Sequence, residues 1–299
     1  MSAKSSRYSV LLAGFVLSGL ILLASACSRP KPIIVGSMSD SGQSVVAEII
    51  AQHLEHTLDR KIARRLNSGN QMLAYQSVST GDITLYPEFT GAIVTGILKE
   101  TADANPEVVL ERARTEMRRT AALELLDPLG FDNPTVLVVR ASDAAEAKVK
   151  TLSDAAAGKF RWKLGVSFDF QQRPNGIIAL NTYNLPMAES VRGLDANALF
   201  PALQAGEVTM ISSTATDGHL TSPDFQILAD DKHVFAPAQA CILVRADALT
   251  AEPKLRAALA ELSGKFTTEA VRKMAAQVDL DHMDPAALAT AFLAQSGLK

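Results

Sequence analysis

The chain has 299 residues, of which 47% are hydrophobic, 20% charged and 5% aromatic, with a formal net charge of −3. This length and balance suit one large globular domain or two compact lobes. The negative charge argues against a nucleic-acid partner, which would require a basic surface.

The first residues have the pattern of an export signal. Lys4 and Arg7 precede an apolar run, Val10 to Leu23, which is short for a membrane span, and small residues then lead to Cys27. A small-residue run ending in Cys resembles the bacterial lipobox, in which the Cys receives lipid and the chain is cleaved before it. We therefore predict a signal peptide at residues 1–26; an uncleaved anchor helix, or an ordinary signal peptide with a coincidental Cys, is the alternative.

Residues 27–32 are predicted to be a lipidated tether that holds the protein on a membrane through Cys27. Cleavage would remove two of the 29 basic residues and none of the 32 acidic ones, which leaves a formal charge of −5. The other cysteine, Cys241, lies in an apolar run and is predicted to be a buried small hydrophobic side chain without a disulfide partner.

Beyond the tether, apolar runs alternate with amphipathic helical patterns. Strands are predicted at 33–35, 83–86, 135–140, 162–167, 208–211 and 240–245. Helices are predicted at 41–58, from 106 onward, at 197–205 and through 252–298. This alternation indicates an α/β protein with mostly parallel sheets, whose ligands bind at the carboxyl ends of strands.

Several segments together resemble one family. Residues 81–91 read GDITLYPEFTG, and further matching segments follow in order at 36–43, 130–133, 173–176, 216–218, 230–232 and 244–245. These segments are similar to those of substrate-binding proteins of ABC importers for glycine betaine, choline or carnitine. The resemblance covers about residues 33–298.

The resemblance implies a two-lobed, type II periplasmic-binding fold with two hinge crossovers, near Thr135 and Ala240. Residues 33–134 and 238–299 would form the first lobe and residues 135–237 the second. It further implies a monomeric receptor on the outer side of a bacterial membrane. That receptor would pass a small polar solute, for which a zwitterion is one candidate, to an ABC permease in the inner membrane.

Members of this family hold quaternary ammonium groups in a cage of tyrosines. Here Tyr86 is present, but Thr135, Ile177 and Ala238 stand where further cage tyrosines are expected. Because each ring contributes about 0.5–2 kcal/mol, this departure predicts weak binding of betaine or a different solute.

The candidate ligand-binding residues lie in loops and strand ends of the matching segments. They are Ser39, Asp40, Gln43, Tyr86, Thr90, Arg173, Thr216 and Asp217. Asp40 has two interpretations that can coexist: it caps the following helix, with Gln43 reaching back to it, or it faces the ligand. Arg173 would contact either a ligand carboxylate or a surface partner. Thr216 and Asp217 would contact the ligand or cap the next turn.

The chain lacks the G-x-S-x-G, P-loop and CxxC motifs, so no enzyme activity and no cofactor are predicted. His53 and His56 are three apart, not the four that a metalloprotease helix requires, and no metal site is predicted. The alternative function is a sensory or assembly lipoprotein that uses the same fold without transport.

Overall fold

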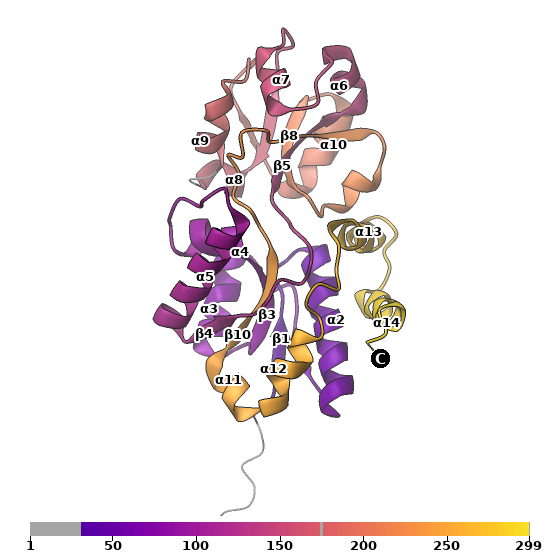
Figure 1. Ribbon diagram of the computed structural model, residues 1–299. Helices are drawn as coiled ribbons and strands as arrows, with labels where there is room; N and C mark the ends of the chain where they lie inside the picture. Colours follow the sequence, from indigo (N-terminus) through magenta and orange to yellow (C-terminus); the bar gives the residue numbers. More distant parts are fainter. Residues whose placement is uncertain (1–30, 174–175, 299) are drawn as a thin grey trace, which may run out of the picture. The chain divides into compact units, whose positions relative to one another are not determined.

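The computed structural model describes residues 31–173 and 176–298, and the predicted signal peptide and Cys27 lie outside this range. Two five-stranded mixed sheets organise the chain from Ile33 onward. The first has the order β2-β1-β3-β10-β4 and the second β7-β6-β8-β5-β9. Figure 1 labels β1, β3, β4 and β10 of the first sheet and β5 and β8 of the second. The predicted α/β fold class is confirmed.

The strands of the first sheet are β1 (Ile34–Gly36), β2 (Ala63–Arg65), β3 (Leu85–Phe89), β4 (Leu123–Leu125) and β10 (Ala240–Arg245). Those of the second are β5 (Thr135–Arg140), β6 (Leu164–Ser167), β7 (Arg192–Leu194), β8 (Met210–Thr214) and β9 (Phe225–Leu228). The predicted strands 135–140 and 240–245 are confirmed. The strand predicted at 83–86 begins two residues later. β2, β4, β7 and β9 are not among the predicted strands, and the first three have only three residues each, too few to show a pattern.

The sheets are less parallel than the sequence predicts. β1 runs parallel to β2 and β3, and β6 runs parallel to β7 and β8. However, β10 is antiparallel to β3 and β4, and β5 is antiparallel to β8 and β9. The exceptions are the two strands that follow a crossing from one sheet to the other, which enter their new sheet from the opposite end.

Helices cover both faces of the first sheet. One face packs against α2 (Ser41–Leu58), α12 (Pro253–Ala260), α13 (Thr268–Asp279) and α14 (Pro285–Gln295). The other face packs against α3 (Gln71–Thr80), the π-helical turn η1 (Ile93–Ile97) and α5 (Pro106–Ala121). The short helices α4 (Thr90–Ala92) and α11 (Ala246–Ala251) follow β3 and β10.

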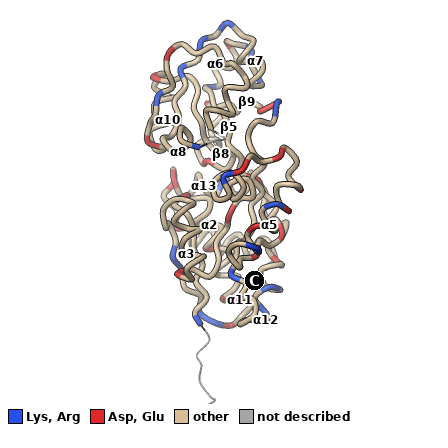
Figure 2. Tube along the Cα trace, turned by 90° about the vertical axis from the view of Figure 1, so that its left-hand side faces the viewer, with Lys and Arg blue, Asp and Glu red and all other residues tan. Residues whose placement is uncertain are grey.

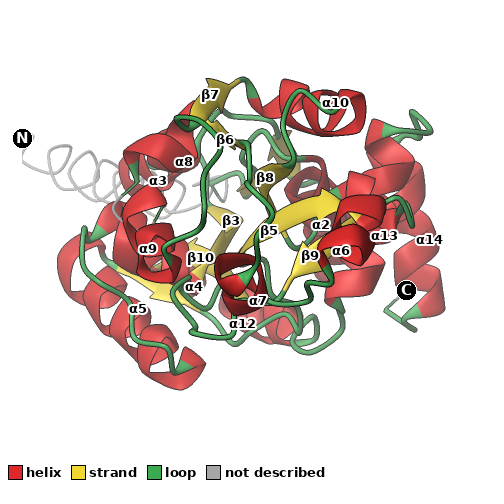
Figure 3. Ribbon diagram, turned by 90° about the horizontal axis from the view of Figure 1, so that it is seen from above, coloured by secondary structure: helices red, strands yellow, loops and turns green. Residues whose placement is uncertain are grey.

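The second sheet is covered in the same way. Seen from above, α8 (Phe168–Gln172) and α9 (Ile177–Leu180) lie to one side of β6 and β8, and α10 (Leu199–Ala205) lies to the other (Figure 3). Two separate apolar clusters, one on each face, correspond to these helices. The remaining elements are α6 (Ala141–Ala147), α7 (Leu152–Ala157), η2 (Asn181–Tyr183), η3 (Ala196–Ala198) and η4 (Gly218–Thr221).

Local sequence signals explain where the main helices start. The side chain of Asp40 accepts a hydrogen bond from the N–H of Gln43 at the start of α2, and Asn105 precedes Pro106 at the start of α5. Asp284 caps α14 in front of Pro285. These residue types satisfy or remove free N–H groups in a first helical turn.

The chain crosses between the sheets twice, and the two crossing segments pair with each other. Asp132 and Gln239 form an antiparallel bridge. The N–H of Asn133 donates to the Ala238 carbonyl at 2.9 Å, and the N–H of Ala240 donates to the Phe131 carbonyl at 3.0 Å. Both strands that follow, β5 and β10, are drawn in Figure 1.

Candidate functional site

A cavity of about 360 Å³ opens where residues associated with the two sheets approach each other. Its size lies at the lower end of the range for small-molecule sites, roughly 300–1,000 Å³. Its lining comes from the β1–α2 loop, the start of α3, the β3–α4–η1 segment, both crossing segments, the end of β8 and the end of α8. The polar and charged lining residues are Ser39, Asp40, Gln43, Asn70, Gln71, Thr95, Lys99, Asn133, Thr135, Arg173 and Thr214.

Asp40 and Gln43 lie side by side at the first turn of α2. The N–H of Gln43 donates to Oδ1 of Asp40 at 2.7 Å, so the predicted cap is confirmed. The side chain of Gln43 does not close a capping box, because its Oε1 accepts a hydrogen bond from the N–H of Met38 at 3.3 Å. Both side chains line the cavity, which leaves the capping and the ligand-facing interpretations of Asp40 compatible.

The electrostatics near Asp40 are negative. Loss of surrounding water raises the pKa of Asp40, and the neighbouring carboxylates of Asp217 and Asp279 raise it further, while hydrogen bonds from the N–H groups of Gln43 and Gly42 oppose the shift. Part of the residue nevertheless stays exposed to the open cavity. A cation at this position would lower the energy of the charged form of Asp40.

Two cations line the cavity as well. Arg173 is exposed at the end of α8, in the half built on the second sheet, and Lys99 is exposed two residues after η1, in the half built on the first. Ser39 belongs to the same loop as Asp40, and its Oγ accepts a hydrogen bond from the N–H of Gly69 at 3.0 Å. The cavity therefore carries charges of both signs.

Tyr86 does not line the cavity. Its ring is fully buried in the apolar cluster beneath α3 and α5, and its hydroxyl donates to Oε2 of Glu88 at 2.8 Å. The placement of Tyr86 disagrees with the expected cage position, because β3 lies between β1 and β10 and has helices over both faces.

Glu88 is the buried partner of that hydroxyl and was not predicted as a site residue. Its carboxylate accepts hydrogen bonds from Tyr86, from the Phe89 N–H at 2.7 Å and from Nε2 of Gln71 at 3.3 Å. Burial raises the pKa of Glu88 to about 7, although these three hydrogen bonds act to lower it. Gln71 lines the cavity, so Glu88 lies directly behind a cavity wall.

Three other candidates make structural contacts in place of cavity contacts. Thr90 is buried, and its Oγ1 accepts from the N–H of Gln239 at 3.2 Å, which ties α4 to a crossing segment. Thr216 is buried, and its N–H donates to Oδ1 of Asn133 at 2.9 Å. Asp217 caps η4, since its Oδ1 accepts from the N–H of His219 at 3.0 Å. Phe89 and Gly91, on either side of Thr90, line the cavity, and Thr214 is the lining residue nearest in sequence to Thr216 and Asp217.

The positions where tyrosines of a cation cage are expected carry small or apolar side chains. Thr135 and Ala238 line it, as does Ala92, whereas Ile177 packs in the second-sheet core. Among the described residues of the lining, Phe89 is the single aromatic side chain, and its ring packs edge-on against Phe131 at 6.2 Å between centroids.

Sequence reasoning missed part of the lining on α3 and η1. Asn70 and Gln71 start α3, and Thr95, Gly96 and Lys99 belong to or follow the π-helical turn. A polar pair at a helix start is a weak signal by itself, because capping accounts for it equally well. Gly96 carries a stronger signal only in the fold, where an added Cβ would lie 2.2 Å from Oε1 of Gln71.

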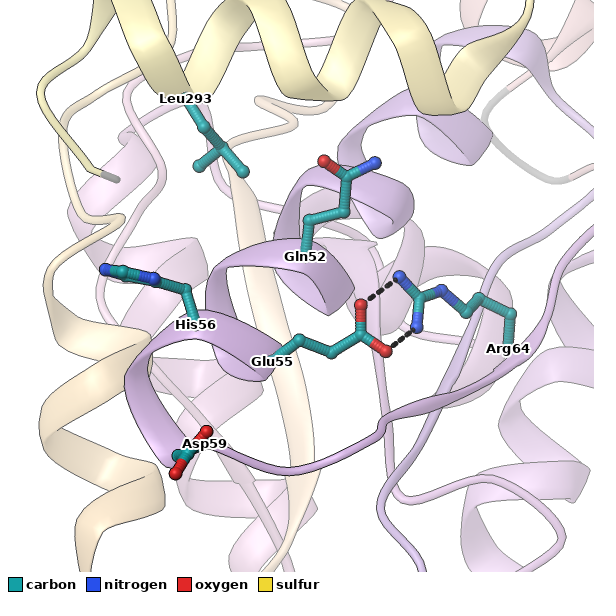
Figure 4. A pocket seen from close by; sticks show the side chains of 6 residues that line it. All are labelled: Gln52, Glu55, His56, Asp59, Arg64 and Leu293. Atoms are coloured by element: carbon teal, nitrogen blue, oxygen red, sulfur yellow. Dashed lines mark hydrogen bonds and ion pairs between the residues drawn. The ribbon is translucent and has the colours of Figure 1, made fainter.

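A second, more open hollow of about 630 Å³ lies where α2 and α14 meet (Figure 4). Within it Glu55 and Arg64 point toward each other and form a bidentate ion pair, with N···O distances of 2.5 and 2.9 Å. This pairing lowers the pKa of Glu55. Since the charged groups at its centre satisfy each other, this hollow is a weaker candidate for ligand binding than the cavity.

Other site types find little support in residues 31–173 and 176–298. No group of three or more His, Cys, Asp or Glu side chains gathers there with a geometry for a metal ion. In the same residues no helix has the length and apolar character needed to cross a bilayer.

Cys241 is buried, and burial raises the pKa of its thiol to about 12, as expected for a packing residue. Figure 2 shows acidic and basic residues interspersed along the trace.

Two sheets joined by paired crossing segments, with a polar cavity between them, define a two-lobed substrate-binding protein of the type II periplasmic-binding class. The family model for the substrate binding domain of ABC-type glycine betaine transport systems matches residues 31–295. The chain therefore belongs to this family, and the family inferred from the sequence motifs is confirmed.

Relatives with assigned solutes are distant. The chain is 27% identical over 296 residues to the ergothioneine transport permease/ergothioneine binding protein EgtU of Helicobacter pylori (strain G27), a match that covers 98% of this chain and 53% of that protein. It thus spans about half the length of that relative. It is 26% identical over 282 residues to the carnitine transport binding protein OpuCC of Listeria monocytogenes serotype 1/2a (strain 10403S), with 91% of each chain covered.

Solved structures agree on the fold. A crystal structure of a glycine betaine/carnitine/choline ABC transporter protein has a TM-score of 0.79 at 22% identity and covers 89% of this chain and 99% of that one. An ABC-transporter choline binding protein in complex with choline has a TM-score of 0.64 at 15% identity, with 91% of each chain covered.

Proposed function

We propose that this protein is the receptor of an ABC importer and captures a small polar, zwitterionic solute in the cavity near Asp40. The single observation that carries the proposal is the cavity itself. It has the size of a small-molecule site, it is lined from both sheets, and it carries Asp40 together with Lys99 and Arg173. The names of the carnitine-binding and ergothioneine-binding relatives support a small solute.

The solute is held between two lobes, residues 33–134 with 238–299 and residues 135–237. The paired segments around Asn133 and Ala238 act as the hinge, because they are the points at which the chain crosses between sheets. Ligand shifts such a hinge equilibrium only by its greater affinity for the closed form, and contacts from both lobes supply that difference.

The receptor works as a monomer on the extracytoplasmic side of a bacterial membrane and delivers its solute unchanged to an ABC permease. Lipid on Cys27 would hold it there. Family membership supports the importer assignment, and the charged, apolar and small-residue pattern before Cys27 supports the anchor.

The tyrosine cage for quaternary ammonium groups is depleted. The side chains of Thr135, Ala238 and Ala92 offer no ring faces, and the ring of Tyr86 is buried. With Phe89 as the one ring in the described lining, a permethylated cation lacks the several ring faces that are its main source of attraction in such a cage.

The test is to fill the cavity. Thr135→Trp places a large ring at the lining, and we expect it to reduce solute binding at least tenfold in calorimetric titrations while the circular dichroism spectrum is preserved. Thr250→Trp, at an exposed position of α11, is the matched control and should bind as the unchanged protein does. Equal binding by both variants would contradict the cavity as the binding site.

The anchor is tested separately in a bacterial host that processes lipoproteins. The unchanged chain should incorporate a labelled fatty acid and sediment with membranes, and Cys27→Ala should do neither. Labelling of the Cys27→Ala variant would contradict lipidation at this residue.

A further inference from the structure

Beside the negative charge of Asp40, the cavity contains a buried hydrogen-bond donor without a partner. Gln43 is 2% exposed, and its Nε2 has no hydrogen-bond partner within the protein. A buried donor left unpaired costs about 1–3 kcal/mol, so its presence in a lining residue indicates that something else accepts from it.

The orientation of this amide is set by the backbone. Oε1 of Gln43 accepts from the N–H of Met38 at 3.3 Å. Turning the amide over would place its NH₂ group against that N–H, two donors facing each other. The unpaired group of the amide is therefore its Nε2 donor, and a ligand group that bonds to it must be a hydrogen-bond acceptor.

Asp40 supplies a hydrogen-bond acceptor next to this donor, because its carboxylate caps the same first turn of α2 and also lines the cavity. A carboxylate accepts hydrogen bonds and donates none when ionised. A cation that carries N–H groups can satisfy it, with charge-assisted hydrogen bonds roughly twice as strong as neutral ones. A quaternary ammonium carries no N–H and would cover the carboxylate with methyl groups, which removes water without replacing its hydrogen bonds.

Resting on the proposed function, we propose that the cavity selects a solute whose cationic nitrogen carries at least one N–H, donated to Asp40, with a hydrogen-bond acceptor nearby that meets Nε2 of Gln43. The class is thus a protonated primary, secondary or tertiary amine with a carboxylate or hydroxyl group, and the permethylated compounds are excluded. The scarcity of aromatic lining described above agrees with this selection, since N–H groups, unlike methylated cations, do not depend on ring faces.

The experiment compares amines with their trimethylated counterparts on the full chain kept in detergent. Calorimetric titrations use three pairs: glycine and glycine betaine, γ-aminobutyrate and γ-trimethylaminobutyrate, and ethanolamine and choline. We expect the amine to bind at least about tenfold more tightly than its partner in each pair that binds, the typical value of one charge-assisted hydrogen bond.

Two variants test the role of Asp40. Asp40→Asn keeps a residue that caps α2 but removes the charge, and it should abolish the preference for the amine. Asp284→Asn makes the same change at the cap of α14 and should leave the preference intact. Melting temperatures of both variants show whether the fold is retained.

Each outcome separates the inference from the function on which it rests. Trimethylated members that bind as tightly as the amines, or a preference that persists in Asp40→Asn, would overturn the inference and leave the receptor function standing. If no member of the panel binds the unchanged protein, the receptor function for small zwitterions and amines fails together with the inference.

Discussion

Individual side chains in this protein divide between those that face the cavity and those that hold its walls. Asp40 and Gln43 belong to the first kind, and Tyr86, Thr90 and Thr216 to the second. Thr90 and Thr216 bond to the crossing segments, and Tyr86 bonds to Glu88, which in turn accepts from the lining residue Gln71. Changes at either kind of residue should affect binding, the first directly and the second through the position of the wall.

The buried carboxyl group of Glu88 should make the stability of the fold depend on pH. Burial raises the pKa of Glu88 to about 7, so the folded chain holds this proton more tightly than the unfolded chain, whose glutamates titrate near 4.5. Between these pH values the folded state binds more protons, and its stability therefore falls as the pH rises. The loss is at most about 3 kcal/mol over this window.

Denaturant unfolding of the unchanged protein and of Glu88→Gln at several pH values between 4.5 and 7.5 measures this effect. The unchanged protein should lose stability relative to the variant as the pH rises. Glu189→Gln, an exposed position, serves as the control and should follow the unchanged protein. Parallel curves for the unchanged protein and Glu88→Gln would contradict a buried Glu88 that titrates near neutral pH.

Helix α4 passes very close to the returning crossing segment. At Gly91 an added Cβ would lie 2.2 Å from the carbonyl oxygen of Pro237 and 3.0 Å from the Cβ of Ala236. Backbone atoms cannot move aside as the end of a long side chain can, so this contact requires glycine.

Gly91→Ala should therefore lower the free energy of unfolding by about 1–3 kcal/mol, the usual cost of an added methyl group in a packed site. Thermal or denaturant unfolding measures the loss. Gly158→Ala is the control, because there the nearest atom to an added Cβ lies at 3.3 Å and φ is −72°. Equal stability of the two variants would show that α4 and residue 237 are not packed in this way.

At the scale of the whole described chain, the two sheet-based halves are joined by more than the crossing segments. Helix α13, which packs on α2, also contacts η4, which follows β8 of the second sheet. Nε of Arg272 donates to the Ala215 carbonyl at 2.8 Å across this contact. This contact between α13 and η4 lies beside the start of α2. A Cβ added at Gly42 in α2 would approach both Val271 of α13 and Thr216, which precedes η4.

Gly218 is the point at which this contact is closest. A Cβ there would lie 2.6 Å from both Cα and N of Ala276. Gly218→Ala should push η4 and α13 apart, lower the free energy of unfolding by about 1–3 kcal/mol and weaken solute binding, because Asp40 and Thr214 would no longer hold their separation. Unfolding and calorimetric titration of this variant, with Gly158→Ala as the reference, measure both effects. Unchanged binding would show that this contact does not position the cavity walls.

The sequence predicted much of the fold because its signals are local. A capping residue followed by proline marks a helix start at Asp284–Pro285, and β-branched apolar runs mark β5 and β10, whose bounds agree with the prediction. β2 was missed because three residues, Ala63–Arg65, are too short for a period-two pattern to show.

The cavity brings together only part of the predicted site residues. Ser39, Asp40, Gln43 and Arg173 line the cavity, but Tyr86, Thr90, Thr216 and Asp217 do not. Tyr86 lies within β3, and along a strand a single step in register exchanges the two faces of the sheet. That step depends on neighbours distant in sequence, as for Tyr86 between β1 and β10.

The sequence by itself thus determined the class of fold, the family, the crossing strands and the caps, since each depends on residues adjacent in the chain or on an ordered set of motifs. Only the tertiary structure decided which side chains reach the cavity, that the Gln43 amide presents an unpaired donor there, and that Glu88 is buried behind it. Those facts depend on how two sheets and their helices pack, and packing brings together residues that no local pattern connects.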